Sequence, residues 1–334
     1  MNLIQPLNLG PLKFPINLIQ GPLAGISCAP FRYLTWKYSQ PAYSCTEMIS
    51  CKTLIHQSKA LQKRFVTLDE REGPVSFQLS SNNPQELGEA SKIVTEYGAS
   101  LIDLNCGCPV KKIRSKGAGS SLLMQPLELY KLIQSMKQNT HLPVSIKIRV
   151  EGNSTDQFNQ EIAKVVTEAG ADFIVVHGRH WTEHYETPCN YQQIQFFVEN
   201  MKIPVIGNGD VACLDSLKKM LATGCAGVMI GRAGVGQPWL INKLISELEQ
   251  KPFSMPDSVE IGEIFIEHIE RLVSLLASEK FAILQARKFA KYYARGLENR
   301  IDFHLAISQI NSFQKLESIT REYFKTSEQL NSVG

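Results

Sequence analysis

Seven polar side chains stand out because each ends a short run of mostly hydrophobic residues. They are Glu47, Gln78, Asn105, Lys147, His177, Asn208 and Arg232. Amide, amine, imidazole and guanidinium groups that lie together offer several N–H donors. Brought to one place, these residues would bind an anionic or electron-rich small molecule.

Lys147 is the most informative of these residues. Polar and apolar side chains alternate from Val144 to Arg149, so the period of a strand places Lys147 on the face opposite Ile146 and Ile148. A buried ammonium group is costly without an anionic partner. We therefore expect a bound anion or an electron-rich cofactor beside Lys147, or, as the structural alternative, an ion pair with a carboxylate such as Asp103. His177 ends its own run in the same way, and its alternative is a purely structural histidine.

Two glycine-rich segments end the last two apolar runs, at residues 207–210 and 231–234. Glycine lets backbone N–H groups approach a phosphate closely, and Arg232 would add a charged donor. The alternative is that these glycines only make tight turns. Neither a Walker sequence nor a G-x-G-x-x-G motif is present, so the expected ligand is a phosphorylated small cofactor or substrate.

Cys106 and Cys108 lead into a basic segment that contains Lys111, Lys112, Arg114 and Lys116. A thiol among cations suits a nucleophile or a proton donor, and the cations would attract an anionic substrate. The alternative is a small buried residue followed by a solvated loop.

Eight apolar runs alternate with helical periodicity, which predicts repeated βα units. The runs are residues 17–20, 42–48, 74–80, 100–106, 143–150, 172–179, 203–210 and 227–234. Eight such units in about 250 residues favour a TIM (β/α)8 barrel over an open doubly wound sheet. In such a barrel the polar run ends meet at one mouth, where active sites form.

The strand pattern stops after the segment 251–256, and helical spacing continues to the end of the chain. We therefore predict a catalytic barrel over 1–250 and a helical domain over 251–334. Arg287, Lys291 and Arg295 recur every four residues and should share a helix face, with Lys288 alongside. Such a face either contacts phosphates or is simply solvated.

Composition excludes several classes of protein. The 35 basic and 32 acidic residues give a net charge of +3, which neither requires nor excludes a polyanionic partner. The eight cysteines contain no C-x-x-C pair, so we expect a reduced, cytoplasmic chain without a metal site. No basic leader and no long apolar run are present, so secretion and membrane spanning are not expected.

These motifs together resemble the tRNA-dihydrouridine synthases, flavoenzymes that reduce uridine in transfer RNA. The resemblance covers nearly the whole chain and, among bacterial subfamilies, is strongest to synthase B, through residues 21–26 and 286–288. The matching residues are Pro22-Leu23-Ala24-Gly25, Phe31-Arg32, Glu47-Met48, Gln78, the run from Asp103 to Pro109, Lys147-Ile148-Arg149, His177-Gly178-Arg179, Asn208-Gly209-Asp210 and Gly231-Arg232.

The resemblance implies that FMN lies across the barrel mouth and that NADPH reduces it. The residues implied to hold FMN are Pro22, Leu23 and Ala24 under the ring, Gln78, Lys147 and His177 at its polar edge, and Asn208, Gly209, Asp210, Gly231 and Arg232 near the phosphate. Reduced flavin would deliver hydride from N5 to C6 of the uracil.

The resemblance also assigns the substrate side of the site. Cys108, and not Cys106, would protonate C5 of the uracil, and Asn105 would hold the base. The target would be a D-loop uridine, with position 17 expected from synthase B, acted on by a monomer. The remaining residues implied to contact RNA are Lys111, Arg179, Arg287, Lys288 and Lys291.

Four positions depart from the family pattern: Leu23 replaces Met, Ser27 and Cys28 replace Thr and Asp, and His180 replaces Thr. Leu23 and Ser27 conserve size or the hydroxyl group and should leave flavin binding intact. Cys28 removes a carboxylate near the entrance and His180 alters a loop near the substrate, so these two changes concern which uridine is the target and not the reaction. Two other functions remain open from the sequence. One is a flavoenzyme of a free pyrimidine, similar to dihydroorotate dehydrogenase, and the other is a non-catalytic tRNA-binding protein.

Overall fold

The parallel strands close into a barrel, because β3 pairs with β11 on one side and with β4 on the other. The short strands β4 and β5 both pair with β6, so together they occupy one of eight positions. The computed structural model describes residues 3–150 and 156–327. The barrel strands are β3 (Leu18–Gln20), β4 (Ser44–Cys45), β5 (Ile49–Ser50), β6 (Val75–Ser80), β7 (Leu101–Cys106), β8 (Val144–Arg149), β9 (Phe173–His177), β10 (Val205–Asn208) and β11 (Gly227–Ile230). The predicted TIM barrel is confirmed.

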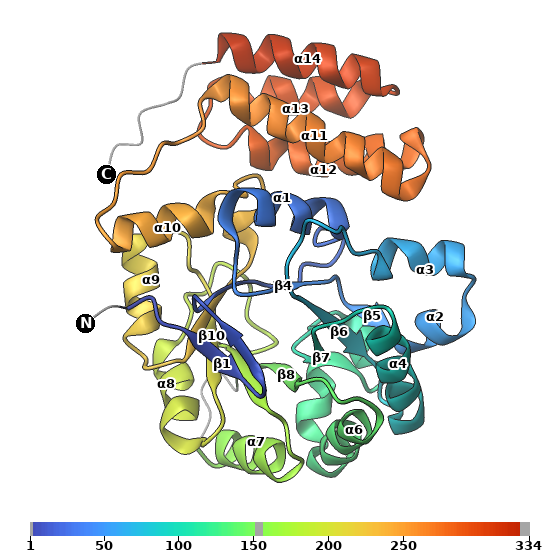
Figure 1. The fold of residues 1–334 in the computed structure, drawn as a ribbon, viewed down its shortest axis with the longest axis vertical. Coiled ribbons are helices and arrows are strands. Elements are labelled where there is room, and N and C mark those ends of the chain that lie inside the picture. Colours follow the sequence, from blue (N-terminus) through green and yellow to red (C-terminus); the bar gives the residue numbers. More distant parts are fainter. Residues whose placement is uncertain (1–2, 151–155, 328–334) are drawn as a thin grey trace.

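Helices surround the barrel and connect its strands (Figure 1). Local signals set their limits: Asn83 and Asn190 accept hydrogen bonds from the first turns of α4 and α8. The connecting segments are α1 (Ala29–Ser39), α2 (Cys51–His56), α3 (Lys59–Val66), α4 (Pro84–Glu96), α5 (Lys111–Arg114), the 3-10 helix η1 (Gly119–Met124), α6 (Pro126–Asn139), α7 (Asp156–Glu168), α8 (Tyr191–Asn200) and α9 (Leu214–Leu221). After the last strand come the 3-10 helix η2 (Arg232–Gly234) and α10 (Leu240–Leu248).

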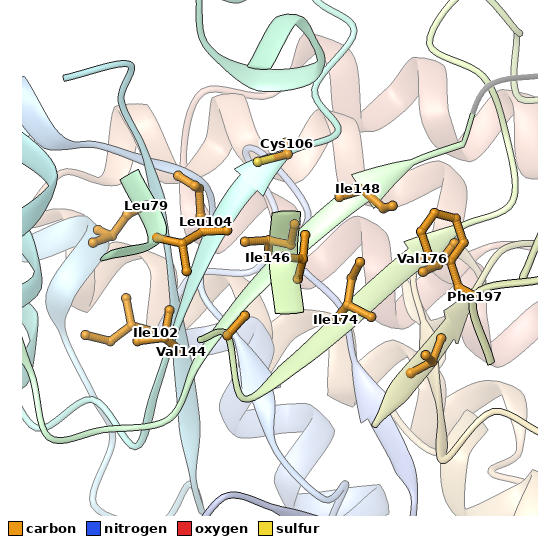
Figure 2. Packing of buried hydrophobic residues seen from close by; sticks show 14 of the residues in the cluster. Leu79, Ile102, Leu104, Cys106, Val144, Ile146, Ile148, Ile174, Val176 and Phe197 are labelled. Carbon is orange, nitrogen blue, oxygen red and sulfur yellow. The ribbon is translucent and has the colours of Figure 1, made fainter. Parts of the chain in front are cut away.

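Alternation along the strands separates two apolar layers. The outer layer lies between strands and helices, and Figure 2 shows Leu104, Ile146, Ile148 and Val176 within it, with Phe197 beside Val176. The predicted alternation of β8 is therefore confirmed, because Ile146 and Ile148 belong to this outer layer.

The inner layer fills the interior of the barrel toward the end where the strands begin, and Tyr43, Phe173 and Met229 pack together there. An antiparallel hairpin of β1 (Leu7–Leu9) and β2 (Leu12–Phe14) joins this layer. A Cβ atom on the hairpin residue Gly10 would lie 3.4 Å from Pro143, just before β8. The hairpin therefore closes the end of the barrel where the strands begin, which leaves the opposite mouth for the site. This hairpin was not predicted.

Four further helices form a bundle at the top of Figure 1. They are α11 (Ser258–Leu276), α12 (Glu279–Tyr293), α13 (Arg300–Gln309) and α14 (Phe313–Thr326), and α11 of this bundle packs against α1. Their shared core includes Phe31 of α1 and Trp239 as well as Phe265 and Phe289, so it is continuous with one side of the barrel. The boundary proposed at residue 250 falls between α10 and α11. Within residues 3–150 and 156–327, no helix is long and apolar enough to span a membrane.

Candidate active site

A cavity of about 460 Å³ opens at the mouth where the barrel strands end. It is lined by residues in the last part of β8, β9, β10 and β11 or just after β3, β9, β10 and β11, and by Tyr292 and Arg295 from the end of α12 and just beyond it. The barrel and the helical segment therefore both contribute to its wall.

Most residues expected to hold the cofactor line this one cavity. They are Pro22, Leu23, Lys147, His177, Asn208, Gly209, Asp210, Gly231 and Arg232, together with Arg179 from the expected RNA-binding set. Ala24 is exposed and Gln78 is buried, and neither lines the cavity. Cys108, Asn105 and Lys111 also lie outside its lining.

The cavity wall is strongly cationic. Lys147, Arg179, Arg232 and Arg295 line it, and Asp210 is its one carboxylate among the described residues. Asp210 pairs with Arg179 and lies 3.6 Å from Arg232, so its charge is already compensated. The surplus of positive charge favours an anionic ligand.

The ammonium group of Lys147 has no hydrogen bond or ion pair to another described residue in the structure. Burial lowers the pKa of Lys147 to about 8, with Arg149 acting in the same direction and Asp103 opposing it. The carboxylate of Asp103 accepts hydrogen bonds from Gln78 and Ser145 instead. The alternative of a direct Lys147–Asp103 ion pair is therefore not what the structure contains.

His177 is a neutral imidazole in this site. Burial, followed by the charges of Lys147, Arg149 and Arg179, holds its pKa well below the usual range. Its Nε2 lies 3.2 Å from Nη1 of Arg179. Because a guanidinium can only donate, Nε2 is the acceptor and Nδ1 carries the proton.

A buried hydrogen-bond chain crosses three strands and ends at the Cys108 loop. Ser145 donates to Asp103 at 2.6 Å, and Gln78 donates to the same carboxylate at 2.7 Å. Asn105 donates to Gln78 at 2.8 Å and accepts from the backbone N–H of Cys108 at 3.0 Å. Burial raises the pKa of Asp103 to about 6. Gln78 therefore orients Asn105 in this structure, and Asn105 is the neighbour of Lys147 in the β7–β8 register.

The two cysteines of this region differ in accessibility. Cys106 ends β7 and is fully buried, and burial raises its pKa well above the usual range. Cys108 is half-buried on the following loop. Gly119 allows the chain to fold back there, because its φ is +64° and a Cβ atom would lie 2.8 Å from the Cys108 carbonyl oxygen. Of the two thiols, only that of Cys108 is available to a substrate.

The basic face predicted for one helix is divided in the structure. The helix α12 ends at Tyr293, so Arg295 lies beyond it and donates to the carbonyl oxygens of Ala233 and Val235 at 3.4 Å. The predicted face shared by Arg287, Lys291 and Arg295 is therefore wrong for Arg295. Arg287 is half-buried and donates to Ile310, whereas Lys291 is exposed.

Lys288 turns toward the barrel. Its ammonium group donates to the carbonyl oxygen of Gly25, in the loop before α1. The carboxylate of Glu47, itself paired with Arg64 at 3.1 Å, attracts this ammonium group, and Cys28 is buried nearby. Lys288 therefore joins the helical segment to the barrel mouth. Lys111 is exposed on α5.

Sequence reasoning missed Tyr185 and Tyr292 in the cavity wall. The ring of Tyr185 lies 3.8 Å from the guanidinium of Arg232, and its carbonyl oxygen accepts from Arg179 at 3.0 Å. Tyr185 lies in an irregular loop, where no periodicity marks it. Tyr292 follows Lys291 directly in the sequence, but only the fold brings it to the cavity. No group of three His, Cys, Asp or Glu residues in the described part of the chain could hold a metal ion.

Known proteins are similar to this sequence over most of its length. The profile of the dihydrouridine synthase family matches residues 19–329. A probable tRNA-dihydrouridine synthase of Rickettsia conorii is 28% identical over 98% of this chain and 99% of its own. The tRNA-dihydrouridine synthase B of Pasteurella multocida is 29% identical over 91% of each chain.

A solved structure shares the fold at low sequence identity. Morphinone reductase superposes with a TM-score of 0.56 and 11% identity, over 78% of this chain and 92% of its own. This similarity supports the barrel architecture alone.

Proposed function

Since this chain belongs to the dihydrouridine synthase family, we propose that it reduces uridine to 5,6-dihydrouridine in the D-loop of tRNA, with FMN as its bound cofactor and NADPH as reductant. The observation that carries the proposal is Lys147, a half-buried cation in the wall of a cationic cavity, with no hydrogen bond or ion pair to another described residue. Position 17 is the uridine that the similarity to synthase B favours.

The cavity fits a phosphorylated flavin. Its wall supplies backbone N–H groups and positive charge, and a Cβ atom on Gly231 would project into space with only Leu23 within 4 Å. We assign Asn208, Gly209 and Arg232 to the phosphate end. Lys147 and the Nδ1–H of His177 supply donors for the polar edge of the ring. The bound flavin supplies the hydride that adds to C6 of the uracil.

On the substrate side we assign the proton transfer to Cys108. Its thiol gives a proton to C5 as hydride arrives at C6, which completes the saturation of the C5–C6 bond, and solvent then returns a proton to the thiolate. Asn105 holds the base, and Gln78 fixes the orientation of Asn105. A uridine must leave its stack to reach this mouth, which favours an accessible loop position.

We assign the helical segment, residues 251–334, to RNA binding, with Arg287 and Lys291 as phosphate contacts. Lys111 and Arg179 lie on the barrel side of the same mouth, and we keep them as RNA contacts. Lys288 donates to the carbonyl oxygen of Gly25, and we keep it as an RNA contact beside that link. A cytoplasmic monomer remains our expectation.

The purified protein tests this proposal directly. FMN should be released on denaturation, and the enzyme with NADPH should convert an unmodified tRNA transcript to a product heavier by two hydrogens, found by nucleoside mass spectrometry. Reduction of free uracil or orotate in place of tRNA would favour the free-pyrimidine enzyme. Tight tRNA binding with no reduction of any substrate would favour the non-catalytic protein.

A further inference from the structure

Two loops of the barrel mouth are joined by a stacked pair. The guanidinium carbon of Arg114, on α5, lies 3.2 Å from the ring centroid of Trp181, in the loop after β9. The Nε of Arg114 is buried and has no hydrogen-bond partner in the described structure. The contact that holds this side chain is therefore the face of the indole ring, where a cation is attracted by the π system.

A second arginine, Arg149, contacts both of these loops. Arg149, at the end of β8, donates to the carbonyl oxygen of His180 at 2.9 Å. The Cγ of Arg149 lies 3.6 Å from the point where Gly107 would carry a Cβ atom, next to Cys108 in the chain. The loop of Trp181 is thus attached to the barrel through Arg149 and to the segment after Cys108 through Arg114.

The segment between Cys108 and Arg114 is short, and hydrogen bonds hold it within itself and to η1. The N–H of Arg114 donates to Val110 at 3.0 Å, and the carbonyl oxygen of Cys108 accepts from Ser120 at 3.1 Å. A displacement of Arg114 would therefore move the backbone that carries Cys108.

We propose that the Arg114–Trp181 stack is a latch that positions Cys108 for proton transfer to the uracil. The proposal rests on the proposed function, since it specifies how the proton donor of that reaction is held. Arg114 and Trp181 are positioning residues, because neither touches the reacting atoms. Proton transfer requires the donor and C5 to lie within hydrogen-bond reach, so a looser loop slows this step without changing flavin reduction.

Single-turnover kinetics on the FMN-loaded enzyme test the latch. The enzyme is reduced with NADPH and then mixed with unmodified tRNA, and dihydrouridine is quantified over time. Trp181→Ala and Arg114→Ala should each slow this step about tenfold, because small misplacements of a catalytic group have large effects on rate. The double variant should be no slower than either single variant, because both remove the same contact. Trp181→Phe keeps an aromatic face and should stay within about twofold of the unaltered enzyme.

A structural role that is unrelated to proton transfer would give a different pattern. The latch predicts that the rate of flavin reduction and the KM for tRNA stay unchanged in Trp181→Ala. Lys112→Ala removes one charge from the same helical turn without touching Trp181, so it reports the effect of charge alone. Equal effects of Arg114→Ala and Lys112→Ala, confined to KM, would overturn the latch and make Arg114 an RNA contact.

Hydrogen–deuterium exchange separates failure of the latch from failure of the proposed function. Amides of residues 108–119 should exchange faster in Trp181→Ala than in Trp181→Phe, whichever reaction the enzyme catalyses. Unchanged exchange would overturn the latch. If the unaltered enzyme forms no dihydrouridine while exchange changes as expected, the proposed function fails and the latch between the loops stands.

Discussion

The side-chain oxygen of Asn105 accepts a hydrogen bond from the backbone N–H of Cys108 at 3.0 Å. This contact ties the proposed proton donor to a strand residue whose amide is itself oriented by Gln78 at 2.8 Å. The loop of Cys108 therefore takes its position from the rigid β6–β7 pair. The proposed base-binding residue, Asn105, therefore also holds the backbone of the proposed acid, Cys108.

Replacement of Cys108 by alanine should lower dihydrouridine formation on the order of a hundredfold, the usual contribution of a general acid. Flavin content and its reduction by NADPH should stay normal, because Cys108 lies outside the cavity lining. The measurement is single-turnover product formation with tRNA. Cys213→Ser is the matched control, since that thiol is exposed on another loop; undiminished product from Cys108→Ala would end the assignment.

Replacement of Lys147 by methionine should affect binding and stability in opposite directions. The protein should lose FMN on desalting, measured by its absorbance, because the cavity loses its central cation. The flavin-free protein should gain about 1 kcal/mol of unfolding free energy at pH 7, because a half-buried charge without an ion-pair partner is removed and solvent in the cavity screens part of its cost. Retained flavin in Lys147→Met would contradict the cofactor assignment.

The lowered pKa of Lys147 also predicts how the stability of the flavin-free protein depends on pH. Burial lowers the folded-state pKa of Lys147 to about 8 from its ordinary value of 10.5. Between these values the unfolded chain binds the extra proton, so this group makes stability rise with pH across that window. Its destabilising effect is complete below about pH 8. Urea titrations at several pH values measure the free energy of unfolding, and Lys147→Met should lack this rise with pH. If the free energy of unfolding changes with pH equally in both proteins, the prediction is refuted.

Neutralisation of Lys291 should weaken tRNA binding and reduce its salt dependence. Each lost phosphate contact lowers the slope of log K against log salt by about 0.9 for duplex and about 0.7 for single strands. Arg287→Gln should act similarly, with flavin absorbance unchanged in both variants. Filter binding between low and moderate salt measures the slopes, and Lys219→Gln on α9 is the control for an exposed charge elsewhere. Slopes equal to that of the unaltered protein would remove these residues from the RNA surface.

Lys288→Met should loosen the contact between α12 and the barrel mouth. The variant loses the donor to Gly25 and leaves the Glu47–Arg64 pair without its neighbour. We expect faster proteolysis within the segment that joins α10 to α11, and slower product formation with tRNA, while flavin reduction is retained. If the only change is a smaller salt slope of tRNA binding, Lys288 acts as a phosphate contact and not as a link between the two parts.

The periodicity of the sequence predicted the features that depend on regular structure. Strand alternation placed Lys147 inside the barrel, and parallel strands necessarily bring Lys147, His177 and Asn208 to one mouth. The polar residues at the ends of the apolar runs therefore predicted much of the cavity wall from the sequence.

Features that depend on irregular segments or on distant pairs were not predictable in the same way. Tyr185 and Trp181 lie in a loop without a repeating pattern, and their contacts with Arg232 and Arg114 exist only in the folded chain. The predicted basic face also assumed that the helix continued past Tyr293. The helix instead ends at Tyr293, and Arg295 lies just after it, where it donates to Ala233 and Val235 and lines the cavity.

Nucleoside mass spectrometry, mapped by position, on tRNA from cells with and without this gene tests the central claim most directly. The account predicts that the two-hydrogen mass gain disappears at one D-loop uridine, expected at position 17, and returns when the gene is restored. Restoration with the Cys108→Ala variant should not return it. An unchanged dihydrouridine pattern at every position, in cells without a second synthase for that site, would contradict the account.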